Sequence, residues 1–213
     1  MGNEILITVA PGETRAALLH SGVVQEVHLE RPRNISLVGN IYMGKVVRIL
    51  PALEAAFVDI GIERNGFLHL SDVANQASKR GKNENPKATD IRHVLHEGQL
   101  VMVQVIKNPI NDKGARLTAE ISVVSRYFAY LPAGRGNKVS HRIRKRDERQ
   151  RLQDNLELML STHEGEGAVG STQQMSTGGY IVRTAAEGVA LKYLQSDLSF
   201  LQNCWKAVQS EKA

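Results

Sequence analysis

Two phenylalanines in the first half of the chain have the chemistry to hold unpaired nucleic-acid bases. Phe57 precedes Asp59 by two residues, and Phe67 precedes His69 by two. Side chains two residues apart in a strand point to the same face, so each ring shares its face with a polar group. Aromatic rings on the wet face of neighbouring strands form a surface on which bases stack. The alternation also fits core rings with polar neighbours at a barrel rim, and periodicity leaves both interpretations open.

A second group with binding chemistry, Arg183 and Thr184, lies at the end of the apolar segment 179–185. A guanidinium offers a planar fork of N–H donors that matches phosphate oxygens, and a hydroxyl adds one donor. A strand end that opens into a loop and a helix also leaves backbone N–H groups free for an anion. The pair predicts a phosphate site. A surface arginine beside a helix-capping threonine would have the same sequence.

Three carboxylates near the first group, Asp59, Glu63 and Asp72, raise the question of metal-dependent hydrolysis. Two-metal hydrolysis requires carboxylates that converge on one point. Asp59 lies beside the aromatic rings, and the spacing pairs none of the three with a second acid at a defined geometry. We therefore predict no catalytic residue and no metal site in this chain.

Short strands separated by turn signals position the two phenylalanines. Segments rich in β-branched, aliphatic and aromatic residues are punctuated by Pro51, Gly61 and the Asn65-Gly66 pair. They predict strands at 43–50, 55–60 and 66–70. The sequence Asp112-Lys113-Gly114 predicts a tight turn that places Lys113 next to the rings.

Both ends of the chain have a different pattern. Residues 4–10, 13–19 and 23–29 predict a β-meander, which is too small to fold alone and must pack on a later segment or on a missing partner. After the barrel strands we predict a long strand (121–131), a helix (147–160), a flexible loop (161–178), a strand (179–185) and a helix (187–211). Apolar residues at spacings of three and four indicate the two helices.

Composition narrows the class of protein. A chain of 213 residues holds one or two domains, and it has neither an apolar run long enough to span a membrane nor a signal-peptide pattern. The single cysteine, Cys204, excludes an internal disulfide and suits the cytoplasm. Residues 133–151 contain eight Lys or Arg against two acids. Such clustering attracts a phosphate backbone, although a solvated helix face would have the same composition.

Several motifs occur in an order that resembles the S1-like RNA-binding module, a five-stranded OB-type barrel. They are GKVxxI at 44–49, AFVDIG at 56–61 and GFLHLSDV at 66–73. The resemblance implies a fourth strand at 98–105 and a fifth within 114–122. It also favours the wet-face interpretation and places the stacking residues at Phe57, Phe67 and His69.

Taken from end to end, the chain resembles the ribonuclease E/G family. The motifs are NIYxGKV at 40–46, LEAAFVDIG at 53–61, KGARLT at 113–118 and IVRTAAEG at 181–188. That family cleaves single-stranded RNA endonucleolytically with bound magnesium and prefers a 5′-monophosphorylated end. The resemblance implies RNA binding by Phe57, Phe67 and Lys113.

The same resemblance implies a 5′-phosphate site. Its residues are Arg183 and Thr184, the backbone near Ser125 and Ala129, and Arg142. Ribonuclease E has a glycine and a valine where Ser125 and Ala129 stand.

These expectations describe an α+β chain with three parts. An S1-like OB-fold barrel (38–119) is inserted between an N-terminal β-meander (1–37) and a C-terminal α+β 5′-sensor region (120–213). The meander is half of a ribonuclease-H-like subdomain, and the 5′-sensor region has two amphipathic helices. By resemblance, the magnesium-binding aspartates lie in a nuclease domain after residue 213, so this chain alone is expected to be inactive and to bind no cofactor.

The expected function is therefore the RNA-binding portion of an endoribonuclease in RNA processing, including rRNA, and decay. Its expected partner is single-stranded RNA with a 5′-monophosphate, with no membrane partner, and a homodimer or higher oligomer of the longer protein stays open. The alternative is a stand-alone S1-like RNA-binding module without a nuclease role. A phosphate sensor at Arg183 and Thr184 favours the first, because a general RNA clamp has no use for one.

Overall fold

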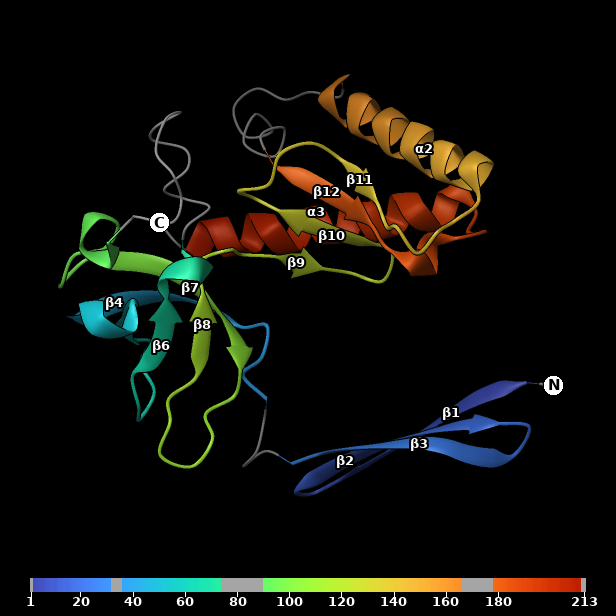
Figure 1. The fold of residues 1–213 in the computed structure, drawn as a ribbon. Coiled ribbons are helices and arrows are strands. Elements are labelled where there is room, and N and C mark those ends of the chain that lie inside the picture. Colours follow the sequence, from blue (N-terminus) through green and yellow to red (C-terminus); the bar gives the residue numbers. More distant parts are fainter. Residues whose placement is uncertain (1, 32–35, 74–89, 166–177, 212–213) are drawn as a thin grey trace. The chain divides into compact units, whose positions relative to one another are not determined.

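A computed structural model of the chain describes residues 2–31, 36–73, 90–165 and 178–211 (Figure 1). The chain divides into two units, Met1–Leu37 and Val38–Ala213. None of the described helices is long and apolar enough to cross a membrane.

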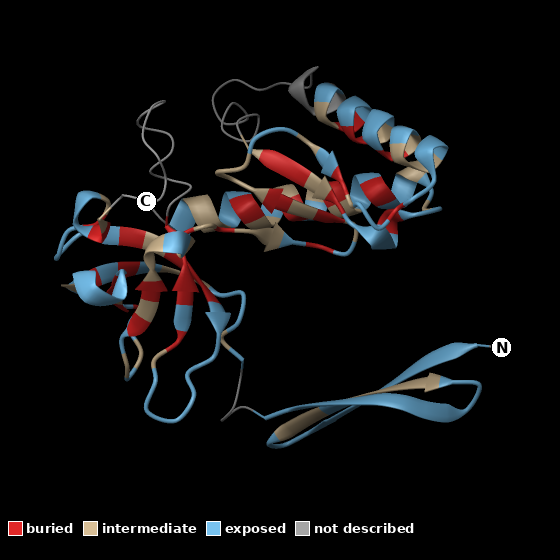
Figure 2. Ribbon diagram, in the orientation of Figure 1, coloured by how far each residue is buried: buried red, intermediate tan, exposed pale blue. Residues whose placement is uncertain are grey.

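The first unit is an antiparallel three-stranded sheet in the order β1-β2-β3. Its strands are β1 (Asn3–Ala10), β2 (Glu13–His20) and β3 (Val23–Glu30), which confirms the predicted meander. Positive φ angles of 101° at Gly12 and 79° at Gly22 supply the tight turns. No described residue of this unit is buried, and β1 and β3 are exposed along their whole length (Figure 2). The sheet therefore has no core of its own.

Five strands of the second unit close a barrel in the order β4-β5-β6-β8-β7. They are β4 (Ile41–Leu50), β5 (Ala55–Asp59), β6 (Gly66–His69), β7 (Leu100–Lys107) and β8 (Arg116–Thr118). Alternate side chains point inward, and these buried residues form the barrel core: Val46, Ala56, Val58, Leu68, Val101, Val103, Val105 and Leu117. The predicted five-stranded barrel is confirmed.

Short 3-10 helices connect the barrel strands. They are η2 (Pro51–Leu53), η3 (Leu70–Asp72) and η4 (Ile91–His93). Residues 74–89, between β6 and β7, lie outside the described residues.

The last barrel strand is shorter than predicted, because its two ends are diverted. Before it, Gly114 passes so close to Asn65 that a Cβ atom at Gly114 would lie 1.9 Å from the Asn65 carbonyl oxygen. After it, the Ala119 N–H donates to the Asp72 carbonyl at 2.9 Å, which draws the chain toward η3 and away from the barrel ladder.

The remainder of the second unit contains a four-stranded sheet in the order β11-β12-β10-β9. Its strands are β9 (Val123–Val124), β10 (Phe128–Leu131), β11 (Lys138–Val139) and β12 (Gly179–Val182). Helix α2 (Arg146–Gly165) contacts β11, and α3 (Leu191–Glu211) contacts β9 and β10. Sheet and helices share one core, which includes Phe128, Tyr130, Val182, Leu152, Leu156, Met159, Leu194, Leu198, Leu201 and Trp205. Both predicted amphipathic helices are confirmed.

Three predicted boundaries in this region are wrong. The predicted strand 121–131 is two strands, with a reversal at 125–127 that pairs Ala129 with Val124. Helix α2 continues to Gly165, so the start of the predicted loop 161–178 is helical, and residues 166–177 lie outside the described residues. Strand β12 ends at Val182, and a 3-10 helix, η5 (Thr184–Ala186), precedes α3, which begins at Leu191 instead of 187.

Candidate nucleic-acid interface

Phe57 and Phe67 lie opposite each other on β5 and β6, on the outer wall of the barrel. Their neighbours Val58 and Leu68 are fully buried, whereas both phenylalanines are only half-buried. The ring centroids are 6.2 Å apart and the ring planes meet at 68°, an edge-to-face arrangement that stabilises the pair. The wet-face interpretation is therefore correct, and neither ring belongs to the core.

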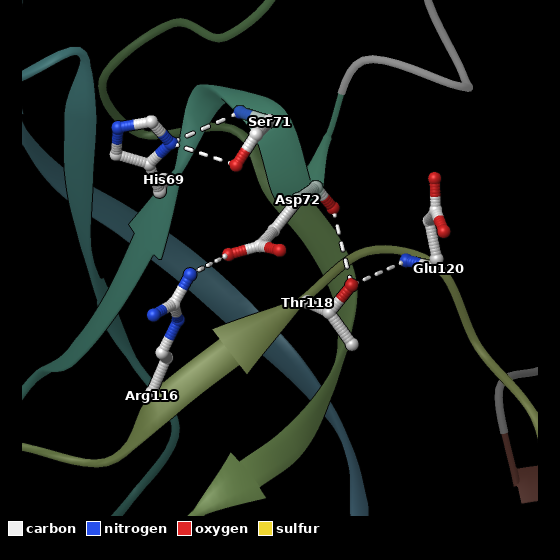
Figure 3. Close-up of polar contacts among 6 residues, drawn as sticks. All are labelled: His69, Ser71, Asp72, Arg116, Thr118 and Glu120. Atoms are coloured by element: carbon white, nitrogen blue, oxygen red, sulfur yellow. Dashed lines mark hydrogen bonds and ion pairs between the residues drawn. The ribbon is translucent and has the colours of Figure 1, made fainter.

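His69 lies at the end of β6, with its ring centroid 6.5 Å from that of Phe67. Its Nδ1 atom accepts the Ser71 N–H at 3.1 Å and lies 2.9 Å from Ser71 Oγ (Figure 3). The His69 ring therefore caps η3 through Nδ1.

Lys113 lies in the predicted tight turn, which is closed by hydrogen bonds in both directions between Ile110 and Lys113. Arg64 fixes this turn by donating to the carbonyl oxygen of residue 111 at 2.6 Å. Gly114 packs directly on Asn65, two residues before Phe67. The exposed Lys113 is thus carried by a loop that runs beside the start of β6.

Two of the three carboxylates considered for hydrolysis have structural roles. Asp72 Oδ2 pairs with Arg116 at 3.1 Å, and the Asp72 carbonyl accepts from Thr118 Oγ1 at 3.2 Å, while the Glu120 N–H donates to the same hydroxyl at 3.0 Å (Figure 3). Asp59 Oδ1 accepts the Gly61 N–H at 2.9 Å.

A magnesium site is absent from this set. Among the residues that the structure describes, no three His, Cys, Asp or Glu side chains are grouped as a metal ion requires. The described residues therefore do not fit the magnesium ion that the family resemblance implies.

Three segments meet at one edge of the four-stranded sheet. Strands β11 and β12 run parallel, so residues 140–142 and 183–184 leave the sheet at the same edge. Strand β10 runs antiparallel to β12 and pairs Phe128 with Val182, which places the turn 125–127 at that edge too. We call this convergence of 125–127, 140–142 and 183–184 the sheet edge.

Arg183 connects two of these segments. Its N–H donates to the Tyr127 carbonyl at 2.8 Å. Its Nη1 atom donates to the carbonyls of Ser125 and of Arg126, the latter at 3.3 Å. A guanidinium carries five N–H donors, and within the described residues the Nε and Nη2 atoms make no hydrogen bond. One nitrogen therefore positions the group, and the Nε–Nη2 side of the fork is left to a ligand.

The turn at 125–127 is held by a residue that sequence reasoning missed, Asp197 of α3. Its Oδ2 atom accepts from Ser125 Oγ at 2.7 Å and from the Tyr127 N–H at 2.8 Å. The Ser125 hydroxyl is buried and also lies 3.2 Å from the Phe128 carbonyl. This carboxylate explains why the predicted strand 121–131 breaks. The only sequence signal was an acid between Leu194 and Leu198 on the apolar side of a helix.

Thr184 is linked to the third segment by Ser140, which sequence reasoning also missed. The two hydroxyl oxygens are 3.1 Å apart, and the Arg142 N–H donates to Ser140 Oγ at 3.4 Å. Arg149 fixes the segment from behind by donating to the Ser140 carbonyl at 2.7 Å. Part of the basic run at 133–151 is therefore structural.

The sheet edge is strongly cationic. Arg126, Arg142 and Arg183 are all exposed, and within the described part of the chain none has a carboxylate within 4.0 Å. The Arg126 guanidinium lies 5.3 Å from the centroid of the Tyr127 ring. Ala129, by contrast, lies inside β10, one residue from the edge, paired with both Val124 and Ile181. The edge is suited to an anion with several acceptor oxygens.

An ion pair anchors the loop that follows Thr184. Glu148 of α2 accepts from Arg151 at 2.6 and 2.7 Å and from the Gly188 N–H at 2.8 Å. The hydrogen bonds from Arg151, followed by the Gly188 N–H, lower the pKa of the Glu148 carboxyl to about 2. Arg151 also donates to the Val189 carbonyl at 3.2 Å. The start of α2 thus holds the backbone between η5 and α3.

Comparison with known proteins adds an independent line of evidence. Residues 37–108 match the S1 RNA binding domain, and residues 122–213 match the Ribonuclease E/G family. Ribonuclease G from Salmonella typhimurium (strain SL1344) is 40% identical over 214 residues, which cover 100% of this chain and 41% of that protein. Ribonuclease E from Nostoc sp. (strain PCC 7120 / SAG 25.82 / UTEX 2576) is 35% identical over 206 residues, or 96% of this chain and 27% of that protein.

The chain thus spans about two fifths of the length of the ribonuclease G relatives that it matches. Among solved structures, the solution structure of GSP13 from Bacillus subtilis is 30% identical, with a TM-score of 0.29, over 38% of this chain and 54% of that chain.

Proposed function

Because the chain belongs to the ribonuclease E/G family, we propose that it is the RNA-recognition portion of a ribonuclease G-like endoribonuclease. In this proposal the barrel binds single-stranded RNA and the sheet edge binds a 5′-terminal monophosphate. The enzyme acts in the cytoplasm, in RNA processing, including rRNA, and decay. In this proposal magnesium-dependent cleavage is the work of a nuclease domain outside the region described here.

The observation that carries RNA binding is the outward-facing pair of Phe57 and Phe67. Every base has an aromatic face, so stacking tolerates any sequence, and each stacked base contributes about 1–3 kcal/mol. His69 extends the surface beyond Phe67, and the Lys113 loop runs beside β6 with a positive charge for the RNA backbone. A duplex cannot offer its bases to such a surface, which makes single-stranded RNA the substrate class.

The sheet edge supports recognition of a terminal phosphate. Such a group carries up to two negative charges and three acceptor oxygens, whereas a bridging phosphodiester has fewer of both. The free side of the Arg183 fork supplies two donors, and the Thr184 hydroxyl beside it supplies another. Arg142 and the backbone near Ser125 complete the proposed site, whereas Ala129 is paired with Val124 and Ile181 inside the sheet and contributes no free group. A phosphate sensor also favours the ribonuclease over a stand-alone RNA-binding module.

Having both sites in one chain would increase affinity for the correct RNA. Once the barrel holds the strand, the 5′ end is tethered close to the sheet edge, so the second contact becomes intramolecular. RNA with a 5′-hydroxyl would bind through the barrel alone. RNA with a 5′-monophosphate would gain about 1–3 kcal/mol, the range for hydrogen bonds to charged groups.

The experiment compares one RNA carrying either a 5′-monophosphate or a 5′-hydroxyl on the unmutated chain and on Arg183→Ala. We expect tighter binding of the monophosphate form, and loss of that preference in Arg183→Ala with little change for the hydroxyl form. The matched control is Arg135→Ala, because Arg135 is exposed near Gly179, at the other end of β12. Equal binding of both RNAs by the unmutated chain would refute the sensor and favour the stand-alone module.

A further inference from the structure

Five residues on the outer wall of the barrel form one cross-strand row. The strand register pairs Arg48 with Phe57, Phe57 with Phe67, Phe67 with Arg116, and Arg116 with Lys107. The next pairs along the barrel, Val46–Val58, Ala56–Leu68 and Leu68–Leu117, are buried, so the row faces outward. The row contains one residue from each strand of the barrel, in the order β4, β5, β6, β8 and β7. We call it the barrel row.

Two β-bulges set the ends of the barrel row. In β4 the register shifts between Val46 and Arg48, so that Arg48 instead of Val47 lies opposite Phe57. In β7 it shifts between Val105 and Lys107, so that Lys107 instead of Ile106 lies opposite Arg116. A bulge inserts one residue and re-aims the side chains that follow it. At both ends the shift brings a cation into the row where regular pairing would have brought an aliphatic residue.

Neither end cation is held in an ion pair among the described residues. Arg48 and Lys107 are exposed, and neither has a carboxylate within 4.0 Å in the described part of the chain. Glu97, the acid bonded next to Arg48, accepts the Ile49 N–H at 3.0 Å and forms no ion pair with Arg48. Arg116, inside the row, instead forms an ion pair with Asp72 at 3.1 Å. Lys45, also exposed on β4, lies opposite Asp59.

We propose that the barrel row is one continuous path for single-stranded RNA that crosses the strands from β4 to β7. Bases stack on Phe57 and Phe67, and phosphates on either side of them bind Arg48 and Lys107. This inference rests on the proposed function of the barrel. It adds the direction in which the RNA runs across the barrel and the two residues that bind its phosphates at either end. Four interstrand steps of about 4.8 Å give a path of about 19 Å. That length suits the short end of the range of about 4–16 nucleotides bound per OB fold.

The chemistry of the row matches the two faces of a nucleotide strand. Rings in the middle bind bases without regard to sequence, while cations at the ends bind the backbone that leaves the platform on each side. Because Arg48 is adjacent to Phe57, its guanidinium can also cover a base stacked on that ring. RNA that ran parallel to one β-strand, instead of across the strands, would contact only one of the two cations.

The test uses an RNA of about ten nucleotides with a 5′-hydroxyl, so that the sheet edge contributes nothing. We expect Arg48→Ala and Lys107→Ala each to weaken binding by about 3-fold to 10-fold, and the effects to multiply in the double variant because the sites are far apart. Each should reduce the slope of log affinity against log salt by about 0.7, the value for one phosphate contact on a single strand. Arg48→Lys, which keeps the charge, should keep the slope.

The matched control is Lys45→Ala, on the same strand as Arg48 but outside the row. If Arg48→Ala and Lys107→Ala behave like Lys45→Ala while Phe57→Ala still weakens binding, the barrel row is refuted and the barrel remains an RNA site. If only one end contributes, the continuous path is refuted as well. If Phe57→Ala has no effect, the proposed function of the barrel fails, and the row fails with it.

Discussion

Asp197 offers the sharpest test of how the sheet edge is built, because one carboxylate oxygen holds the whole turn at 125–127. In Asp197→Ala the part-buried Tyr127 N–H loses its acceptor at 2.8 Å, and leaving it unpaired costs about 1 kcal/mol of folding free energy, the low end of the range for buried groups. The Ser125 hydroxyl loses less, because it can still donate to the Phe128 carbonyl at 3.2 Å. Asp197→Asn keeps an oxygen acceptor, so it should cost less than Asp197→Ala.

The turn carries the carbonyls that position Arg183, so Asp197 is a positioning residue for the proposed phosphate site. We expect the preference for 5′-monophosphate RNA to fall about 5-fold in Asp197→Asn, the equivalent of one hydrogen bond of about 1 kcal/mol. Binding of 5′-hydroxyl RNA should not change. This contrast separates positioning from a general loss of stability.

Both effects are measurable on one protein. Trp205 is the single tryptophan, lies on the same helix as Asp197 and is buried against Tyr130, so its fluorescence reports unfolding of this core. Gln195→Ala, an exposed change on the same helix, is the control. The reasoning is refuted if folded Asp197→Asn keeps the full phosphate preference, or if Asp197→Ala is as stable as the control.

Phe57→Ala and Phe67→Ala should each weaken RNA binding by about 1–3 kcal/mol without unfolding the barrel, since neither ring is in the core. Unfolding of the barrel in either variant would contradict this. Glu148, whose pKa is about 2 in the folded chain against an ordinary 4.5, should stabilise the fold fully above about pH 4.5 and lose that contribution as the pH falls toward about 2. Denaturation followed through Trp205 should therefore show a loss of stability over this range that is absent from Glu148→Gln, and equal slopes for the two proteins would count against the anchoring role. Incubation of the chain with 5′-monophosphorylated RNA and magnesium should give no discrete cleavage products, and cleavage that Asp59→Asn or Glu63→Gln abolishes would place an active site in the barrel.

The sequence was most informative where local pattern and tertiary environment agree. In β5 and β6 alternation separated Val58 and Leu68 from Phe57 and Phe67, and the resemblance to the S1-like module decided which face is inside. The helices α2 and α3 were predicted because their apolar residues recur at the helical period and face one core.

Features imposed by distant partners could not be predicted. Residues 121–131 contain no Gly or Pro before position 132, so nothing local signals the reversal at 125–127. The reversal depends on Asp197, 72 residues away from Ser125, and on Arg183, 58 residues away. The bulges at Val47 and Ile106 could not be predicted from the sequence either, because both residues suit a regular strand. Only the observed strand register therefore shows that Arg48 and Lys107 belong to the barrel row.

The central claim is that one chain holds two separate RNA sites, and a crossed comparison tests it most directly. Affinities for 5′-monophosphate and 5′-hydroxyl RNA are measured at one salt concentration on the unmutated chain, Phe57→Ala and Arg183→Ala, since phosphate contacts depend on salt. Phe57→Ala should weaken both RNAs by the same factor and keep their ratio. Arg183→Ala should bring the ratio to one and leave the affinity for 5′-hydroxyl RNA nearly intact. If either variant lowers both the affinity for 5′-hydroxyl RNA and the ratio, the two sites are not separate and the account is contradicted.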